Sequence, residues 1–170
     1  MRNELLSVAR STLVTAAIAT AVTAQCGFVS SPGGSGCGSS TPFGIPTIAC
    51  AGQPQLGNQS FAVTARVPCA MSASALLLGN CLGTPQLIRG PFGANGFCGP
   101  TEAVCALYVD VALSVVIPGT ATSGGASFAI PVPNDPGLRS LRFCAQEWNL
   151  CTLPTGSCLG ASQAISITLM

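Results

Sequence analysis

The sequence of 170 residues contains no histidine and no lysine, and charged residues of all kinds make up only 6% of it. Its formal net charge is +1. Without histidine or lysine, the Ser–His, Cys–His and Ser–Lys nucleophile systems of common enzymes cannot be assembled. A chain with so little positive charge also lacks the electrostatic surface that binds nucleic acid or anionic lipid. The sequence therefore predicts no nucleic-acid partner and no enzyme of these classes.

Helical periodicity is also absent from the chain beyond its first 24 residues. Residues 61–67, 126–132 and 141–146 instead alternate apolar side chains with small or polar ones, as half-buried β-strands do. Turn signals separate these segments, and the chain has 20 glycines and 13 prolines. We predict an all-β, single-domain antiparallel β-sandwich of about seven to nine short strands.

The corner between the last two of these strands is the clearest local signal. Asp135 is expected to cap a short helical turn with Pro136 in its first position, where the missing N–H costs nothing. Residues 81–100 are expected to be mostly loop with one strand at residues 86–89, and residues 151–160 are expected to form another loop. Residues 164–170 are predicted to form an uncharged closing strand with Ile165, Ile167 and Leu169 on one face.

The amino-terminal segment has the layout of a secretory signal peptide. Arg2 and Arg10 precede an apolar run over residues 11–22. Val22 and Ala24 are the small residues expected at positions −3 and −1 of a cleavage site. The run is shorter than the roughly 20 residues that span a membrane, so we expect no membrane span in the mature chain. The predicted divisions are a signal peptide at 1–24, a Gly/Ser/Cys-rich arm at 25–42 and a β-sandwich domain at 43–170.

Ten cysteines follow the expected cleavage site. In an exported chain they predict five disulfide bonds. No Cys-x-x-Cys pair and no histidine are present, so we expect no metal site, no cofactor and no thioredoxin-like chemistry. Spacing alone leaves the pairing open. The disulfide candidates are Cys26, Cys37, Cys50, Cys69, Cys81, Cys98, Cys105, Cys144, Cys151 and Cys158.

A carboxylate pair, as glycosidases use, is the catalytic arrangement that the composition still permits. Asp135 is better explained as a cap, Asp110 is expected to face water, and Glu102 lies at a strand entrance. Strict alternation would point Glu147 into the core. Because unpaired buried carboxylates are costly, we expect a bulge or strand end at Gln146 to turn Glu147 outward. The sequence therefore predicts no catalytic residues.

Three residues are candidates for contact with a ligand, namely Tyr108, Glu147 and Trp148. A tryptophan side chain stacks on the apolar face of a sugar ring, although a single tryptophan is more often packed in a core. A carbohydrate-binding role is therefore an alternative that the sequence leaves open.

Several segments together resemble a group of uncharacterised secreted domains of planctomycete-like bacteria. The most specific is residues 130–138, IPVPNDPGL, supported by residues 105–109, CALYV, and 162–168, SQAISIT. Such domains carry a "PIPNDPxLxGLxFYxQ" core and end in "SNAlxlTI". The group has no established activity, so the resemblance implies export and a β fold but no chemistry.

The resemblance also implies a disulfide between Cys37 and Cys105, the recurrent cysteine positions of the group. Cys144 stands where the group has tyrosine, and Cys151 and Cys158 occupy a loop that normally lacks cysteine. These departures lead us to expect a local bond from Cys144 to Cys151 or Cys158.

The favoured function is a non-catalytic, secreted or cell-surface structural or interaction module of a bacterium. The alternatives are a carbohydrate-binding or adhesin module and, next, a carboxylate-based hydrolase. The expected partners are copies of the chain, other envelope proteins or glycans. Self-assembly is predicted on the assumption that residues 164–170 form an exposed sheet edge without lysine or other charges.

Overall fold

In a computed structural model, the structure describes residues 26–28, 37, 45–67, 69–89, 96–98, 104–122, 124–154 and 156–170. The predicted signal peptide lies outside these residues. The strands are β1 (Cys26–Phe28), β2 (Thr47–Ala51), β3 (Ala62–Arg66), β4 (Met71–Gly79), β5 (Cys81–Arg89), β6 (Gly96–Phe97), β7 (Val104–Val109), β8 (Val115–Pro118), β9 (Thr120–Thr122), β10 (Gly125–Ala129), β11 (Arg142–Leu153) and β12 (Gly156–Thr168). Two 3₁₀ turns, η1 (Val111–Leu113) and η2 (Pro136–Leu138), join them.

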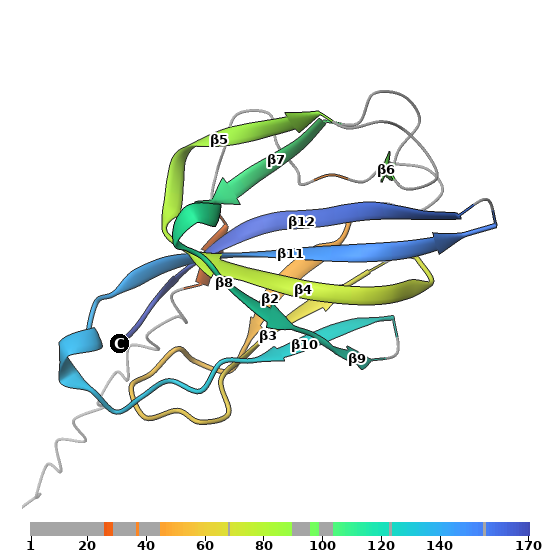
Figure 1. The fold of residues 1–170 in the computed structure, drawn as a ribbon. Helices are drawn as coiled ribbons and strands as arrows, with labels where there is room; N and C mark the ends of the chain where they lie inside the picture. The colour runs from red at the N-terminus through yellow and green to blue at the C-terminus, as the bar shows by residue number, and fades with distance from the viewer. Residues whose placement is uncertain are drawn as a thin grey trace, which may run out of the picture.

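The strands form three sheets that lie in layers (Figure 1). The large sheet has the order β1-β12-β11-β4-β8, and the short strand β6 pairs with β12 in parallel. The second sheet, β2-β3-β10-β9, covers one face of the large sheet, and the two-stranded ribbon β5–β7 lies over the other. All pairings except that of β6 are antiparallel, which confirms the predicted all-β fold. The described residues contain twelve strands, more than the sequence predicts.

The main core fills the space between the large and second sheets. Phe61, Val63 and Phe128 pack there, on the side of the second sheet. Leu76 and Ile167 belong to the same buried cluster, from the large sheet. Burial of these alternating side chains supplies the main driving force for the sandwich, at about 25 cal/mol for each Å² of apolar surface.

The corner between β10 and β11 has the predicted geometry. The Oδ1 atom of Asp135 accepts a hydrogen bond from the Gly137 N–H at 2.9 Å, and Pro136 begins η2. None of the helices in the described part of the chain has the length and apolar composition needed to cross a membrane.

Residues 86–89 form a strand as predicted, but residues 81–85, 151–153 and 156–160, which were predicted to be loop, are also strand, so those predictions are wrong. Residues 81–89 form β5, and residues 151–160 belong to the long hairpin of β11 and β12, in which Cys151 lies opposite Cys158. The Gly/Ser/Cys-rich arm contributes β1. Local turn signals fail here because pairing with distant strands decides β structure more strongly than local composition.

The closing strand is not a sheet edge. Ile165 in β12 pairs with Phe28 of β1 on one side and with Ala145 of β11 on the other. Ile165 and Ile167 are buried in the main core. The basis of the self-assembly prediction at residues 164–170 is therefore wrong, because residues 165–167 at the centre of this segment are paired on both sides.

All ten cysteines are paired in the structure. The disulfides are Cys26–Cys50, Cys37–Cys105, Cys69–Cys151, Cys81–Cys144 and Cys98–Cys158. The bond implied between Cys37 and Cys105 is confirmed, whereas the local bond expected at Cys144 is wrong. Cys144 lies opposite Gly79 in the β11–β4 pairing. Cys81 follows Gly79 by two residues, which brings it close enough to bond to Cys144.

We predict that non-reducing peptide mapping of the exported protein will recover a linked pair of peptides containing Cys81 and Cys144, and no alkylated cysteine. Digestion with pepsin at low pH suits this measurement, because thiolates are needed for disulfide exchange and are scarce in acid. Recovery of Cys144 linked to Cys151 or Cys158 would contradict the structure.

Candidate functional site

The polar residues of the central strand β11 form a cluster inside the fold. Gln146, Glu147 and Asn149 have exposed fractions of 0%, 0% and 1%. They lie where β11 is flanked by β4 and β12 and where the large sheet is covered on both faces. Buried polar groups are normally retained only when they are hydrogen-bonded, so these three side chains need partners inside the protein.

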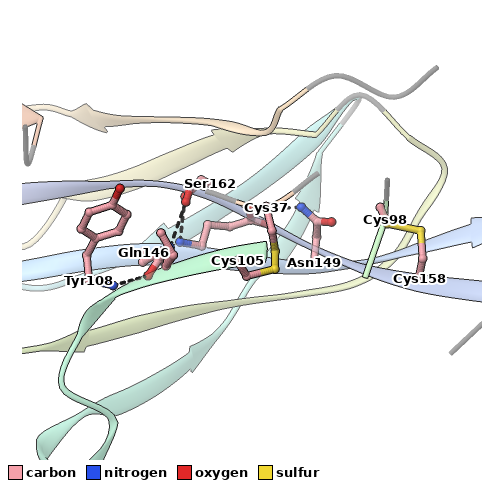
Figure 2. The surroundings of a disulfide bond; sticks show 10 residues. Cys37, Cys98, Cys105, Tyr108, Gln146, Asn149, Cys158 and Ser162 are labelled. Atoms are coloured by element: carbon pink, nitrogen blue, oxygen red, sulfur yellow. Dashed lines mark hydrogen bonds between the residues drawn. A yellow bond between two sulfur atoms is a disulfide. The ribbon is translucent and has the colours of Figure 1, made fainter. Parts of the chain in front are cut away.

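Gln146 joins the large sheet to the ribbon above it (Figure 2). Its Oε1 atom accepts a hydrogen bond from the Tyr108 N–H at 3.1 Å, and its Nε2 donates to the carbonyl oxygen of Ala106 at 2.7 Å. Nε2 also donates to the carbonyl oxygen of Ser162 at 3.0 Å. The side-chain amide therefore acts as a short piece of backbone, because it satisfies peptide groups of β7 and β12 that lie in different layers.

A β-bulge in β12 lies opposite Glu147. Gln146 pairs with Ala164 and Trp148 with Ala161, so the single residue Glu147 lies opposite both Ser162 and Gln163. The Ser162 hydroxyl oxygen accepts the hydrogen bond of the Glu147 N–H at 3.0 Å. A bulge leaves one residue unpaired, and here a side chain replaces the missing ladder partner.

The bulge or strand end predicted at Gln146 is absent from β11, because the extra residue lies in β12, and Glu147 is not turned outward, so that prediction is wrong. On its other side β11 keeps regular register with β4, and Glu147 lies opposite Leu76. Glu147 therefore shares the core-facing side of Leu76. Its Oε1 accepts a hydrogen bond from the Ser74 hydroxyl at 2.7 Å, and its Oε2 accepts one from Asn149 Nδ2 at 3.2 Å.

Burial raises the pKa of Glu147 from 4.5 to about 7, and the hydrogen bonds from Ser74 and Asn149 oppose this rise in part. Both of these partners are neutral, so no positive charge among them offsets the desolvation of the carboxylate. A carboxyl group with a pKa near 7 is suited in principle to general acid–base chemistry. Since no part of Glu147 is exposed, it does not reach a substrate in this structure.

The space around Asn149 is adapted to its side chain. Gly160 lies opposite Asn149 in the hairpin, and a Cβ atom at Gly160 would come within 2.6 Å of Asn149 Oδ1. Glycine at position 160 avoids this close contact and leaves space for the Asn149 side chain on the neighbouring strand.

The three predicted ligand-contact residues do not share a surface. Tyr108 is 1% exposed and Glu147 is 0% exposed, and they lie on opposite sides of the large sheet. Trp148 is half-buried and packs with Ile88 and Leu159 against the Cys37–Cys105 disulfide. The structure gives these three residues packing roles, and the prediction that they contact a ligand stays untested.

The other candidate carboxylates lie apart from Glu147. Asp110 caps η1 by accepting a hydrogen bond from the Ala112 N–H at 3.0 Å, and Asp135 caps η2. Glu102 lies outside the described residues. Among the residues that the structure describes, no second carboxylate therefore lies beside Glu147 to form the pair that a glycosidase needs.

One group of sulfur atoms has the proximity of a metal site. The Sγ atoms of Cys98, Cys151 and Cys158 lie within 4.8 Å of one another. Each belongs to a disulfide, and a disulfide sulfur lacks the negative charge of the thiolate that binds zinc. In the oxidised protein these atoms therefore form two adjacent covalent links at the end of the β11–β12 hairpin.

Sequence reasoning missed the residues that complete the cluster, namely Ser74, Gln146, Asn149 and Ser162. A signal was present, because Gln146, Glu147 and Asn149 place polar groups on both faces of one strand. Such a strand is either exposed on both sides or buried with internal partners, and only the layers above and below β11 decide between these.

Comparisons of the chain with protein-family models, with curated proteins and with solved structures found no match. The resemblance to planctomycete-like secreted domains therefore stays a prediction, and function must be argued from the residues of the chain itself.

Proposed function

We propose that this chain is a non-catalytic secreted or cell-surface domain of a bacterium that acts as a structural or interaction module. The observation that carries the proposal is that the carboxylates of the described residues have structural roles. Glu147 is enclosed between the sheets, and Asp110 and Asp135 cap 3₁₀ turns. Five disulfides fit an extracellular protein, because such bonds persist in oxidising compartments.

An exposed apolar strip, formed by Val111, Leu113, Val115 and Val116, favours an interaction role. These side chains are 54–66% exposed and follow one another along η1 and β8, at the edge of the large sheet. Val115 and Val116 lie opposite Leu78 and Leu77 of β4 and point to opposite faces of this edge. Exposed apolar residues that gather at one edge are typical of surfaces that pack against another macromolecule.

The partner packs through side chains rather than by extending the sheet. The Gly119 N–H bonds to the carbonyl oxygen of Ser74 in β4, so the nitrogen of Pro118 points away from the sheet. Proline at that position removes an outward N–H group, a device that protects an edge strand from pairing. No charged side chain occurs among residues 111–118, so two copies can face each other about a twofold axis without charge repulsion.

We expect the native domain to form a concentration-dependent dimer in sedimentation experiments and the double variant Leu113→Ser, Val115→Ser to remain monomeric. Both side chains are exposed, so their replacement should change the stability by less than about 1 kcal/mol. Leu87→Ser, at an exposed leucine on β5, is the matched control and should dimerise like the native chain.

Two results would overturn the proposal in different ways. A strictly monomeric native protein at about millimolar concentration, where even weak association is detectable, would remove the apolar strip as a self-packing surface. Hydrolysis of glycosides that disappears in Glu147→Gln, with the fold retained, would replace the module by a carboxylate hydrolase.

A further inference from the structure

A cleft of about 520 Å³ lies where the corner around η2 meets the loop after β2 and the end of β12. Its volume falls within the range of small-molecule sites, about 300–1,000 Å³. Four polar side chains line it: Gln53, Gln55, Asn134 and Arg139. The apolar part of the lining comes from Leu56, Pro136 and Met170.

The walls of this cleft are held together by backbone hydrogen bonds between distant segments. The Leu56 N–H donates to the carbonyl oxygen of Met170 at 2.9 Å, and the Met170 N–H donates to that of Pro54 at 3.0 Å. The Gly57 N–H donates to the carbonyl oxygen of Pro133 at 3.2 Å, which ties the loop to the corner. The backbone of the cleft is fixed in this way, whereas the exposed side chains of Gln53, Gln55, Asn134 and Arg139 would be ordered by a ligand on binding.

The position of Arg139 is fixed by its own backbone and by the residue that follows it. The Arg139 N–H donates to the carbonyl oxygen of Pro136 at 3.1 Å. Ser140 has a φ of 67°, in the left-handed region, and its N–H bonds to the carbonyl oxygen of Leu169 at 2.9 Å. This strained conformation is retained by the surrounding bonds, and it sets the direction in which the chain leaves the cleft.

The polar side chains of the cleft are not used within the fold. Among the described residues, Gln53, Gln55, Asn134 and Arg139 make no hydrogen bond or ion pair through their side chains. This contrasts with Gln146 and Asn149, whose amides are bonded inside the protein. Three amides and one guanidinium group, all exposed, therefore remain available to a ligand around one cleft.

From these groups we infer that the cleft binds an acidic sugar, that is, a small ligand with one carboxylate and several hydroxyl groups. A guanidinium group binds a carboxylate with two parallel hydrogen bonds. Amide side chains both donate to and accept from hydroxyl groups, while Leu56, Pro136 and Met170 match the apolar face of a sugar ring. The inference rests on the proposed non-catalytic role and names the ligand of such a module.

The test is a titration of the full-length mature protein, followed through its backbone amide signals in NMR. Glucuronate and galacturonate should cause saturable shifts at Asn134 and Arg139, with dissociation constants in about the millimolar range. Glucose, which lacks the carboxylate, and acetate, which lacks the hydroxyl groups, should each bind at least about tenfold more weakly.

The variant Arg139→Gln should lose at least about tenfold in affinity for the acidic sugars, because a charge-assisted bond to a carboxylate is removed. Arg66→Gln is the matched control, since Arg66 is exposed on β3 and does not line the cleft. Unchanged affinity in Arg139→Gln, equal binding of acetate, or absence of shifts at about 10 mM sugar acid would overturn the inference.

Incubation of the protein with oligomers of galacturonate, which contain glycosidic bonds, followed by analysis for released sugars, separates this inference from the proposed function. Binding at Asn134 and Arg139 with turnover would support the cleft and overturn the non-catalytic role. Absence of both binding and turnover would overturn the inferred ligand site. The proposed interaction role would then still be supported by the apolar strip.

Discussion

The free energy of unfolding of the Glu147→Gln variant minus that of the native chain should be about 3 kcal/mol larger at pH 8 than at pH 4. The pKa of Glu147 is about 7 in the folded protein and 4.5 for the unperturbed group. The folded state therefore binds this proton more tightly than the unfolded state. The stability that Glu147 contributes should be greatest below pH 4.5, fall between pH 4.5 and 7, and level off above pH 7.

The glutamine variant removes this titration while it keeps the size of the side chain. Its Oε1 atom can still accept from Ser74, whereas a new contact between two amide groups at Asn149 adds a cost that is the same at both pH values. Comparing the difference at pH 8 with that at pH 4 therefore isolates ionisation. Denaturant unfolding with the disulfides intact is the measurement.

The outcome that contradicts this account is equally specific. If the native chain becomes more stable from pH 5 to pH 8, or if native and variant curves stay parallel, then Glu147 is not held in a desolvated site.

The Gln146→Leu variant should lose about 3–6 kcal/mol of unfolding free energy. Leucine has a similar size but leaves the Tyr108 N–H and the carbonyl oxygens of Ala106 and Ser162 without their partner. Each buried unsatisfied group costs about 1–3 kcal/mol. Because two of these groups belong to β7, the loss should also loosen the β5–β7 ribbon.

Gln163→Leu is the matched control for this change. Gln163 is exposed on β12, so the same substitution there should alter stability by less than about 1 kcal/mol. Hydrogen exchange of the β7 amides should quicken in Gln146→Leu and stay unchanged in Gln163→Leu. Equal stability of the two variants would show that the Gln146 amide does not join the layers.

Several features of the fold could be predicted because their causes are local. The alternation of residues 61–67 predicted β3, and the Asp135-Pro136 pair predicted the capped turn η2. Ten cysteines without a histidine predicted complete disulfide pairing. Each of these three features depends on side chains a few residues apart or on composition. None of them requires knowledge of which segments meet in the fold.

The site depends on segments far apart in the sequence. Glu147 was expected to face outward because an unpaired buried carboxylate is costly, and that cost is visible in its raised pKa. The burial is tolerated because β4 supplies Ser74 and the same strand supplies Asn149. No local pattern states that Ser74, 73 residues away, lies within reach of Glu147.

The sequence alone determined an all-β, disulfide-bonded domain, because apolar alternation and cysteine content act through local geometry and covalent chemistry. Only the tertiary structure decided that β12 is paired on both sides, that Cys144 bonds to Cys81, and that Gln146 joins two layers. These outcomes depend on strand order, and strand order follows from the burial and pairing of the whole chain rather than from any single segment.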